Sequence, residues 1–183
     1  ALPAIEQARV FEGPVWNFLC LESEIAEPGD WKTSFVGTMP VVAGRTEDGA
    51  VAAFENRCAH RGALICFDDD GKGAKDFQCV YHAWRYDLRG NLASVAFRRG
   101  VNGLGGMADD ECPEARGPRK LRIETFHGLV FGTLSDATPP LRDYLGPDVA
   151  RMAERVVAGR QIEIVGRFVE SLPNNWKIGR AHV

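Results

Sequence analysis

Two short units that each pair a cysteine with a histidine constrain this chain more than any other feature. The units, Cys58-Ala-His60 and Cys79-Val-Tyr-His82, together supply two thiolates and two imidazoles, enough to hold one metal centre. A structural zinc site normally takes its ligands as cysteine pairs and histidine pairs. One cysteine and one histidine in each unit instead favour a [2Fe–2S] centre in which one iron takes both cysteines and the other takes both histidines. A zinc ion, or four core residues without a metal, are the alternatives that the spacing leaves open.

The size and composition of the chain fit one ordinary globular domain with an appendage. Its 183 residues are 45% hydrophobic, so a core can form without disulfide bonds. The net charge of −3 and the lack of a long basic cluster argue against nucleic acid as a partner. The basic stretches at Arg98-Arg99 and at 116–120 are interpreted as solvated surface, with a docking face for an acidic electron-transfer partner as the alternative.

The five cysteines indicate a reducing compartment. Their number is odd, and the sequence shows neither a signal peptide nor an apolar run long enough to span a membrane. We therefore expect a cytoplasmic protein without a membrane partner, in which Cys58 and Cys79 are ligands. Cys20, Cys66 and Cys112 are expected to be small packing residues.

Short apolar segments separated by turns predict a fold that is mainly β with a few short helices. Residues 1–12 should be helical, and strands are predicted at 15–21, 32–36, 40–44, 51–55, 123–126 and 129–133. Asp48-Gly49 lies between two apolar stretches, which is typical of a hairpin turn. Further tight turns are expected at 86–92 and at His127-Gly128, where His127 is interpreted as a turn residue rather than a ligand. Short strands repeated at these intervals indicate a small antiparallel barrel or sandwich.

The character of the sequence changes after Pro139-Pro140, where we place a domain boundary. A helix is predicted to start at Pro147 and to end at Gly159, and a strand is predicted at 161–169. Apolar side chains recur at helical spacing along the helix: Val149, Met152, Val156 and Val157. The chain is thereby divided into a helical segment at 1–12, a metal-binding domain at 13–138 and a further unit from residue 139.

Both Cys–His units directly follow strand-like segments, at 52–56 and 76–78. Each should therefore lie on a loop that projects from a sheet, and two such loops can close on one cluster. His60 and His82 are expected to lie nearer the surface than the cysteines, so the imidazoles offer the route for an electron. Trp84 either covers the cluster or is an ordinary core aromatic. Arg61 either holds a loop carbonyl or carboxylate or is a surface side chain.

The residues around the four candidate ligands resemble a known family. The pattern Cys58-x-His60-Arg-Gly and Cys79-x-Tyr-His82-x-Trp84 is similar to that of the large (α) subunit of Rieske non-haem iron aromatic-ring-hydroxylating dioxygenases. The similarity extends from Val10 to Lys177 and includes Phe54-Glu-Asn-Arg-Cys58, Gly117-Pro-Arg-Lys-Leu-Arg122, Gly128-Leu-Val-Phe-Gly132 and Leu172-Pro-Asn-Asn-Trp-Lys177. Within the family, oxygenases of aromatic carboxylates such as terephthalate, anthranilate and salicylate are the most similar.

The resemblance implies a Rieske [2Fe–2S] barrel or sandwich domain with an electron-transfer role. Its metal ligands would be Cys58, His60, Cys79 and His82, with Arg61, Tyr81 and Trp84 around the cofactor. Residues 139–177 would begin an α+β catalytic domain, whose mononuclear Fe(II) would be bound by residues that this chain does not contain. The whole enzyme would add both atoms of O₂ to an aromatic carboxylate, with electrons from a reductase or ferredoxin. A small (β) subunit and further α subunits would complete the assembly.

The resemblance also predicts a low reduction potential. High-potential Rieske proteins carry an extra cysteine in each loop and a serine near the cluster, whereas this chain has Ala63, Tyr81 and Trp84 at the corresponding positions. Without those groups, we expect a potential of about −150 mV.

The alternative function is a stand-alone Rieske ferredoxin-type electron carrier. The helix and strand predicted after the last barrel strand favour a fragment of an oxygenase, which alone should be inactive as an oxygenase because the second iron site is missing. Residues 178–183 do not resemble the family and match the translation of a sequencing adapter, so we expect a non-native tail and assign no role to His182.

Overall fold

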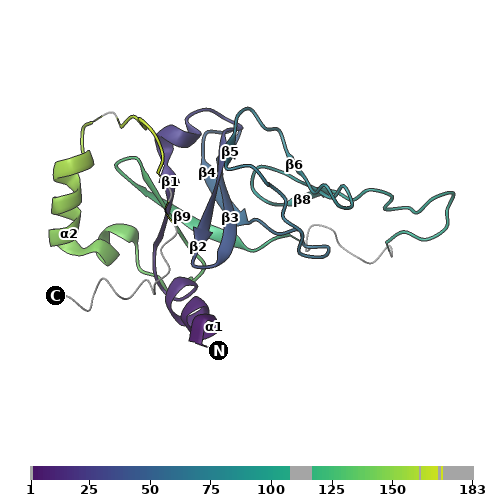
Figure 1. The fold of residues 1–183 in the computed structure, drawn as a ribbon, viewed down its shortest axis with the longest axis horizontal. Helices are drawn as coiled ribbons and strands as arrows, with labels where there is room; N and C mark the ends of the chain where they lie inside the picture. The colour runs from purple at the N-terminus through teal and green to yellow at the C-terminus, as the bar shows by residue number, and fades with distance from the viewer. Residues whose placement is uncertain (1, 108–116, 161, 169, 171–183) are drawn as a thin grey trace.

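The computed structural model describes residues 2–107, 117–160, 162–168 and 170 (Figure 1). This part of the chain is mainly β with few helices, as predicted. The main sheet contains β1 (Asn17–Leu21), β2 (Trp31–Val36), β3 (Met39–Arg45), β4 (Val51–Glu55), β5 (Asp70–Gly71), β9 (Lys120–Phe126) and β10 (Leu129–Thr133). A smaller sheet contains β6 (Phe77–Gln78), β7 (Arg85–Tyr86) and β8 (Leu92–Ser94). The helical segments are α1 (Leu2–Glu6), the π-helical η1 (Gln7–Phe11), the 3-10 helix η2 (Glu22–Ile25) and α2 (Leu141–Val157).

The main sheet is antiparallel and curls on itself. Its strand order is β1-β10-β9-β4-β3-β2-β5, yet β1 and β2 are in contact. Contact between strands so far apart in the order requires a curled, barrel-like sheet. The smaller sheet and α2 lie on opposite sides of the main sheet (Figure 1). The curled sheet is thus a scaffold with the smaller sheet at one end.

The hairpins predicted from turn residues are confirmed. β3 and β4 pair with Val42 opposite Phe54, and Gly49 in the connecting turn has φ 83°, a conformation that glycine adopts without strain. β9 and β10 pair around His127-Gly128, and His127 lies in the turn as expected. β7 and β8 are joined by the tight turn predicted at 86–92.

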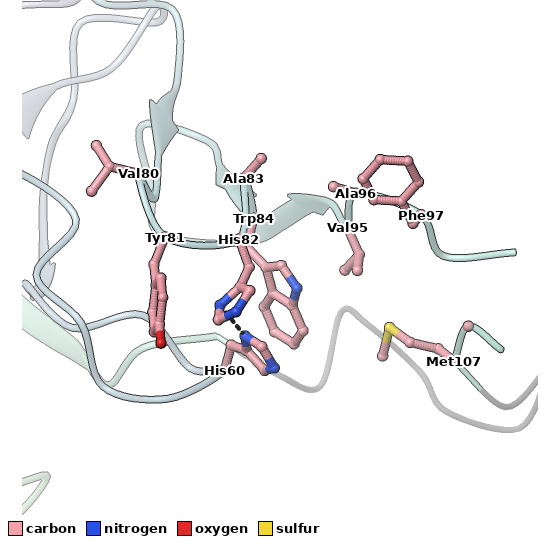
Figure 2. Close-up of a pocket in the computed structure, with 11 residues that line it drawn as sticks. His60, Val80, Tyr81, His82, Ala83, Trp84, Val95, Ala96, Phe97 and Met107 are labelled. Atoms are coloured by element: carbon pink, nitrogen blue, oxygen red, sulfur yellow. Dashed lines mark hydrogen bonds between the residues drawn. The ribbon is translucent and has the colours of Figure 1, made fainter. Parts of the chain in front are cut away.

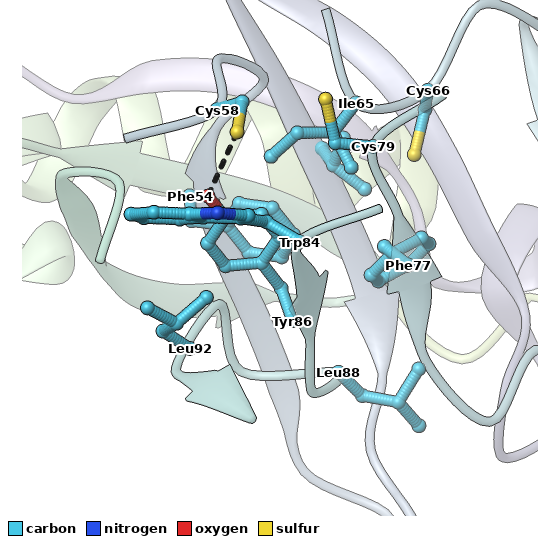
Figure 3. Close-up of a cluster of buried hydrophobic side chains, with 11 residues drawn as sticks. Phe54, Cys58, Ile65, Cys66, Phe77, Cys79, Trp84, Tyr86, Leu88 and Leu92 are labelled. Atoms are coloured by element: carbon cyan, nitrogen blue, oxygen red, sulfur yellow. Dashed lines mark hydrogen bonds between the residues drawn. The ribbon is translucent and has the colours of Figure 1, made fainter. Parts of the chain in front are cut away.

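Buried side chains form three separate clusters. One fills the curled sheet and includes Val36, Val41, Leu121 and Val130. A second lies between the main and smaller sheets and includes Phe54, Cys58, Cys66, Phe77, Cys79, Trp84 and Tyr86 (Figure 3). The third lies under α2 and consists of Trp16, Phe126, Leu141 and Ala150. Both thiols of the Cys–His units therefore belong to the second core.

The helix after the proline pair differs from the prediction. α2 already begins at Leu141, where the Glu124 carboxylate accepts the backbone N–H at 2.8 Å. It breaks at Gly146, whose φ is 68°, and resumes at Pro147, so the predicted start is the start of its second part only. Val149, Met152 and Val156 are exposed, and the buried residue of this part is Ala150. A carboxylate from β9 thus accepts the first N–H of the helix, and this contact is not visible in the local sequence.

Residues 162–168 have no strand pairing, so the predicted strand is wrong for them. Cys20 and Cys66 are buried thiols, which confirms their packing role. Cys112, the matched segment at 172–177, the tail at 178–183 and His182 lie outside the described residues. Within the described part, no helix is long and apolar enough to cross a membrane.

Candidate metal centre

The first Cys–His unit lies on a tight loop after β4. The Cys58 N–H donates to the Ala63 carbonyl at 2.7 Å, and the Gly62 N–H donates back to the Cys58 carbonyl at 2.7 Å. Gly62 has φ 72°, so the turn uses the freedom of glycine. The Arg57 guanidinium also donates to the Gly62 carbonyl, at 3.0 Å. The loop is therefore closed by its own backbone.

The second loop repeats this hydrogen-bond pattern. The Cys79 N–H donates to the Trp84 carbonyl at 2.9 Å, and the Ala83 N–H donates to the Cys79 carbonyl at 2.9 Å. Ala83 has φ 53° at the position equivalent to Gly62. Both cysteines thus start a loop with the same backbone hydrogen-bond pattern.

The two thiols lie together in the core. Cys58 and Cys79 are buried, and Cys79 is close enough to Cys58 to raise the pKa of its thiol. Burial is the main cause of that raised pKa, whereas hydrogen bonds from Tyr86 and from the His60 N–H favour the thiolate. The Tyr86 hydroxyl lies 3.1 Å from the Cys58 Sγ atom (Figure 3).

The two imidazoles lie together nearer the surface. Their Nδ1 atoms are 3.1 Å apart, and both rings are half-buried (Figure 2). Trp84 stacks on His60 with ring centroids 4.9 Å apart and an interplanar angle of 15°. Tyr81 lies beside His82 with a centroid separation of 4.0 Å and remains exposed. The predicted arrangement, with histidines nearer the surface than cysteines, is present.

The donor set fits a two-iron cluster. In the part of the chain that the structure describes, no group of three or more His, Cys, Asp or Glu side chains is placed to hold a single metal ion. The four donors are instead arranged as a sulfur pair and a nitrogen pair, an arrangement that would give each iron of such a cluster one pair of ligands. Thiolates and neutral imidazoles are the ligands of a mixed-ligand [2Fe–2S] centre.

The candidate residues around the donors divide into two groups. Tyr81 and Trp84 contact the imidazoles, and Trp84 is both a core aromatic and a cover for His60. Arg61 is exposed, and among the described residues it is Arg57 that holds a carbonyl of this loop. Tyr86 of β7 was not among the predicted site residues, although it follows Trp84 by two residues and both side chains point into the same core.

A known domain matches the region that contains both loops. The profile of the Rieske [2Fe-2S] domain matches residues 15–104. This chain carries a Rieske domain. The match includes strands β1 to β5 of the curled sheet, the smaller sheet and all four donor residues.

Large subunits of oxygenases are similar over more than the Rieske domain. Subunit alpha 2 of the terminal oxygenase component of terephthalate 1,2-dioxygenase from Comamonas sp. is 53% identical over 94% of this chain. The large subunit of anthranilate 1,2-dioxygenase from Burkholderia cepacia is 49% identical over 94%. The chain spans 41% and 40% of the length of these two relatives.

Solved oxygenase structures share the fold. Naphthalene 1,2-dioxygenase with indole bound superposes with a TM-score of 0.74 at 36% identity, over 84% of this chain and 33% of that one. A quaternary ammonium Rieske monooxygenase superposes with a TM-score of 0.70 at 27% identity, over 83% of this chain and 41% of that one. The predicted family resemblance is confirmed.

Proposed function

We propose that this chain is the electron-transfer part of the α subunit of a ring-hydroxylating dioxygenase. Cys58 and Cys79 would hold one iron of a [2Fe–2S] cluster, and His60 and His82 would hold the other. The observation that carries the proposal is the separation of the donors into a buried sulfur pair and a half-buried nitrogen pair. When bound, a cluster of this kind supplies a one-electron redox centre.

The surrounding residues stabilise the two ends of the site differently. The Tyr86 Oη atom accepts the Ala59 N–H at 3.0 Å, so its own proton is left to point at the Cys58 Sγ atom. Trp84 and Tyr81 hold the imidazole rings by aromatic contact and exclude water from one face of each. The thiol end is thus closed to solvent, and electrons would enter and leave at the imidazole end.

Two features support an oxygenase origin over a stand-alone carrier. Similarity to oxygenase large subunits covers 94% of the chain, well beyond residues 15–104. α2 and its attachment to β9 also lie outside that range. We accordingly propose a Rieske domain at 13–138 and the start of a catalytic domain at 139–177, with the mononuclear iron bound elsewhere in the whole enzyme.

The substrate and partners are proposed from the relatives. An aromatic carboxylate resembling terephthalate or anthranilate is proposed as the substrate, because the relatives with those names are 53% and 49% identical. A reductase or ferredoxin would supply electrons, and a β subunit and further α subunits would complete the assembly. We place the protein in the cytoplasm because the described cysteines are unpaired thiols.

The test is reconstitution of the chain with iron and sulfide without oxygen, followed by reduction and EPR spectroscopy. We expect the visible absorption and EPR signal of a Rieske centre in the wild type and in the Cys66→Ser and His127→Ala controls. Cys58→Ser and His82→Ala should abolish that signal. Binding of zinc without an EPR signal, or a signal that survives Cys58→Ser, would overturn the ligand assignment. A potentiometric titration then tests the low potential, about −150 mV.

A further inference from the structure

Asn56 is a buried polar residue between the main sheet and the first cluster loop. It follows β4 directly, and its backbone N–H donates to the Pro40 carbonyl at 2.8 Å, which ties it to the start of β3. Its side chain is 2% exposed. A polar group at this depth is costly unless every hydrogen-bonding atom has a partner.

The Asn56 side-chain amide makes three hydrogen bonds, and all its partners lie where the chain returns from the loop. Its Oδ1 atom accepts the Ile65 N–H at 3.1 Å and the Cys66 N–H at 2.9 Å. Its Nδ2 group donates to the Cys66 carbonyl at 2.8 Å. One side chain therefore joins the start of the loop at residue 56 to its end at residues 65 and 66.

We propose that Asn56 is a positioning residue that sets where Cys58 and His60 stand relative to Cys79 and His82. Residues 57–64 carry both donors of the first loop. The three side-chain bonds of Asn56 join the two ends of that segment, and its backbone N–H ties them to β3. The internal bonds of the loop shape it but do not anchor it to the sheet. The Ala59 N–H links the loop to Tyr86 on β7, and the anchoring of the loop to the main sheet falls to Asn56. This proposal rests on the proposed function of the loop donors.

The geometry requires asparagine and not a residue of similar size. Aspartate would keep the two acceptor positions, but it would place a second oxygen against the Cys66 carbonyl, where a donor is needed. Leucine or alanine would leave two N–H groups and one carbonyl without the partner that they have now. Both kinds of change should let the loop shift away from the second pair of donors.

The experiment compares Asn56→Asp and Asn56→Ala with the matched control Thr133→Val. Thr133 is equally buried and lies on β10, which belongs to neither cluster loop. Its hydroxyl forms a 2.8 Å hydrogen bond with the Thr138 hydroxyl. All three variants lose a buried hydrogen bond and should unfold at lower urea concentration. Only the Asn56 variants should shift or broaden the EPR signal of the reduced cluster and release iron to a chelator faster, by about tenfold or more.

The outcomes separate this proposal from the proposed function. If the wild-type chain gives no Rieske EPR signal, the proposed function fails first. If the wild type gives the signal and Asn56→Ala keeps an unchanged spectrum and release rate, Asn56 is not a positioning residue. If the Asn56 variants do not fold, hydrogen exchange of the Ile65 and Cys66 amides in the wild-type apoprotein tests whether Asn56 holds this part of the loop. Protected Ile65 and Cys66 N–H groups support the proposal, and exchange as fast as that of the exposed Arg61 amide overturns it.

Discussion

A single side-chain hydroxyl affects how well the thiol end of the site holds negative charge. The Tyr86 hydroxyl receives one N–H, from Ala59, and lies 3.1 Å from the Cys58 sulfur. Since hydrogen bonds to a thiolate stabilise its negative charge, this one should favour the reduced cluster, which carries one electron more. A hydroxyl group of Tyr86 therefore contributes to the stability of the reduced state, even though Trp84 stands where high-potential proteins have serine.

Replacing Tyr86 by phenylalanine should lower the reduction potential. If the hydrogen bond stabilises the reduced cluster over the oxidised one by about 1 kcal/mol, its loss should lower the potential by about 40 mV for one electron. The potential should be measured by a dye-mediated titration followed by EPR. Tyr144→Phe, at an exposed position on α2, is the control and should leave the potential unchanged. An unchanged or higher potential in Tyr86→Phe would contradict the assigned direction of the hydrogen bond.

The equivalent turn positions of the two loops predict opposite effects of exchanging glycine and alanine. Ala83 has φ 53°, in the left-handed region that costs a residue with a Cβ atom about 1–2 kcal/mol, whereas Gly62 has φ 72° and open space around it. Ala83→Gly should raise the free energy of unfolding by a few tenths of a kcal/mol or more, after the entropy cost of glycine. Gly62→Ala should lower it by about 1 kcal/mol. Urea unfolding checks both, and destabilisation by Ala83→Gly would argue against strain at this turn.

Cys20 makes stability sensitive to alkaline pH. Burial raises the pKa of its thiol to about 12, and Glu24 adds to the effect. Above the ordinary pKa of about 9, the unfolded state releases the Cys20 proton while the folded state keeps it. The free energy of unfolding is therefore unaffected by this group below pH 9 and declines between pH 9 and pH 12. The free energy of unfolding should fall by up to about 1.4 kcal/mol per pH unit from this group. Cys20→Ala should show a shallower slope of unfolding free energy against pH, and an identical slope would refute the assignment.

At the level of elements, contacts between strands and helices explain what the local sequence could not. The hairpins and the Cys–His loops follow from turn residues and spacing, and they were predicted. The roles of Tyr86 and Asn56 depend on partners 28 and 10 residues away in the sequence, which no local pattern specifies. The start of α2 was missed because Pro139-Pro140 reads as a linker, whereas Glu124 and the Trp16 indole both hydrogen-bond this segment.

Removing the carboxylate that caps α2 should loosen its first part. Glu124→Ala should lower the free energy of unfolding by about 1 kcal/mol, the usual effect of losing a helix cap. It should also speed amide exchange in residues 141–145, ahead of the break at Gly146. Asp148→Ala is the matched control, because its partner Arg151 is exposed and surface pairs contribute little. Equal exchange rates in the two variants would show that Glu124 does not support the helix.

For the whole molecule, the separation of the cores should confine the effects of metal loss. The thiols belong to the core between the two sheets, while the core of the curled sheet contains neither of them. The core around the thiols includes Phe54 of β4 but no residue of β9 or β10, so a disturbance at the cluster should reach β9 only through its pairing with β4.

Removal of iron from the loaded chain should confirm this confinement. Chelation should speed amide exchange at 57–64 and 79–84 and spread no further than the strands that contribute to this core, β3, β4, β6, β7 and β8. Peptides from β9 and β10 should exchange as in a mock-treated sample. Exchange mass spectrometry is the measurement, and a uniform rise across all strands would show that the molecule depends on the metal for its global fold.

The bonds that close the two loops also bear on the order of events when the protein matures. Every bond that shapes and anchors them joins atoms of the chain itself, from the paired cysteine turns to the Asn56 amide. Small zinc domains differ, because their metal-binding free energy is folding free energy. We therefore expect this chain to fold with its donors near their final positions before a cluster binds. Cluster insertion would then be a late step, made to a protein that is already folded.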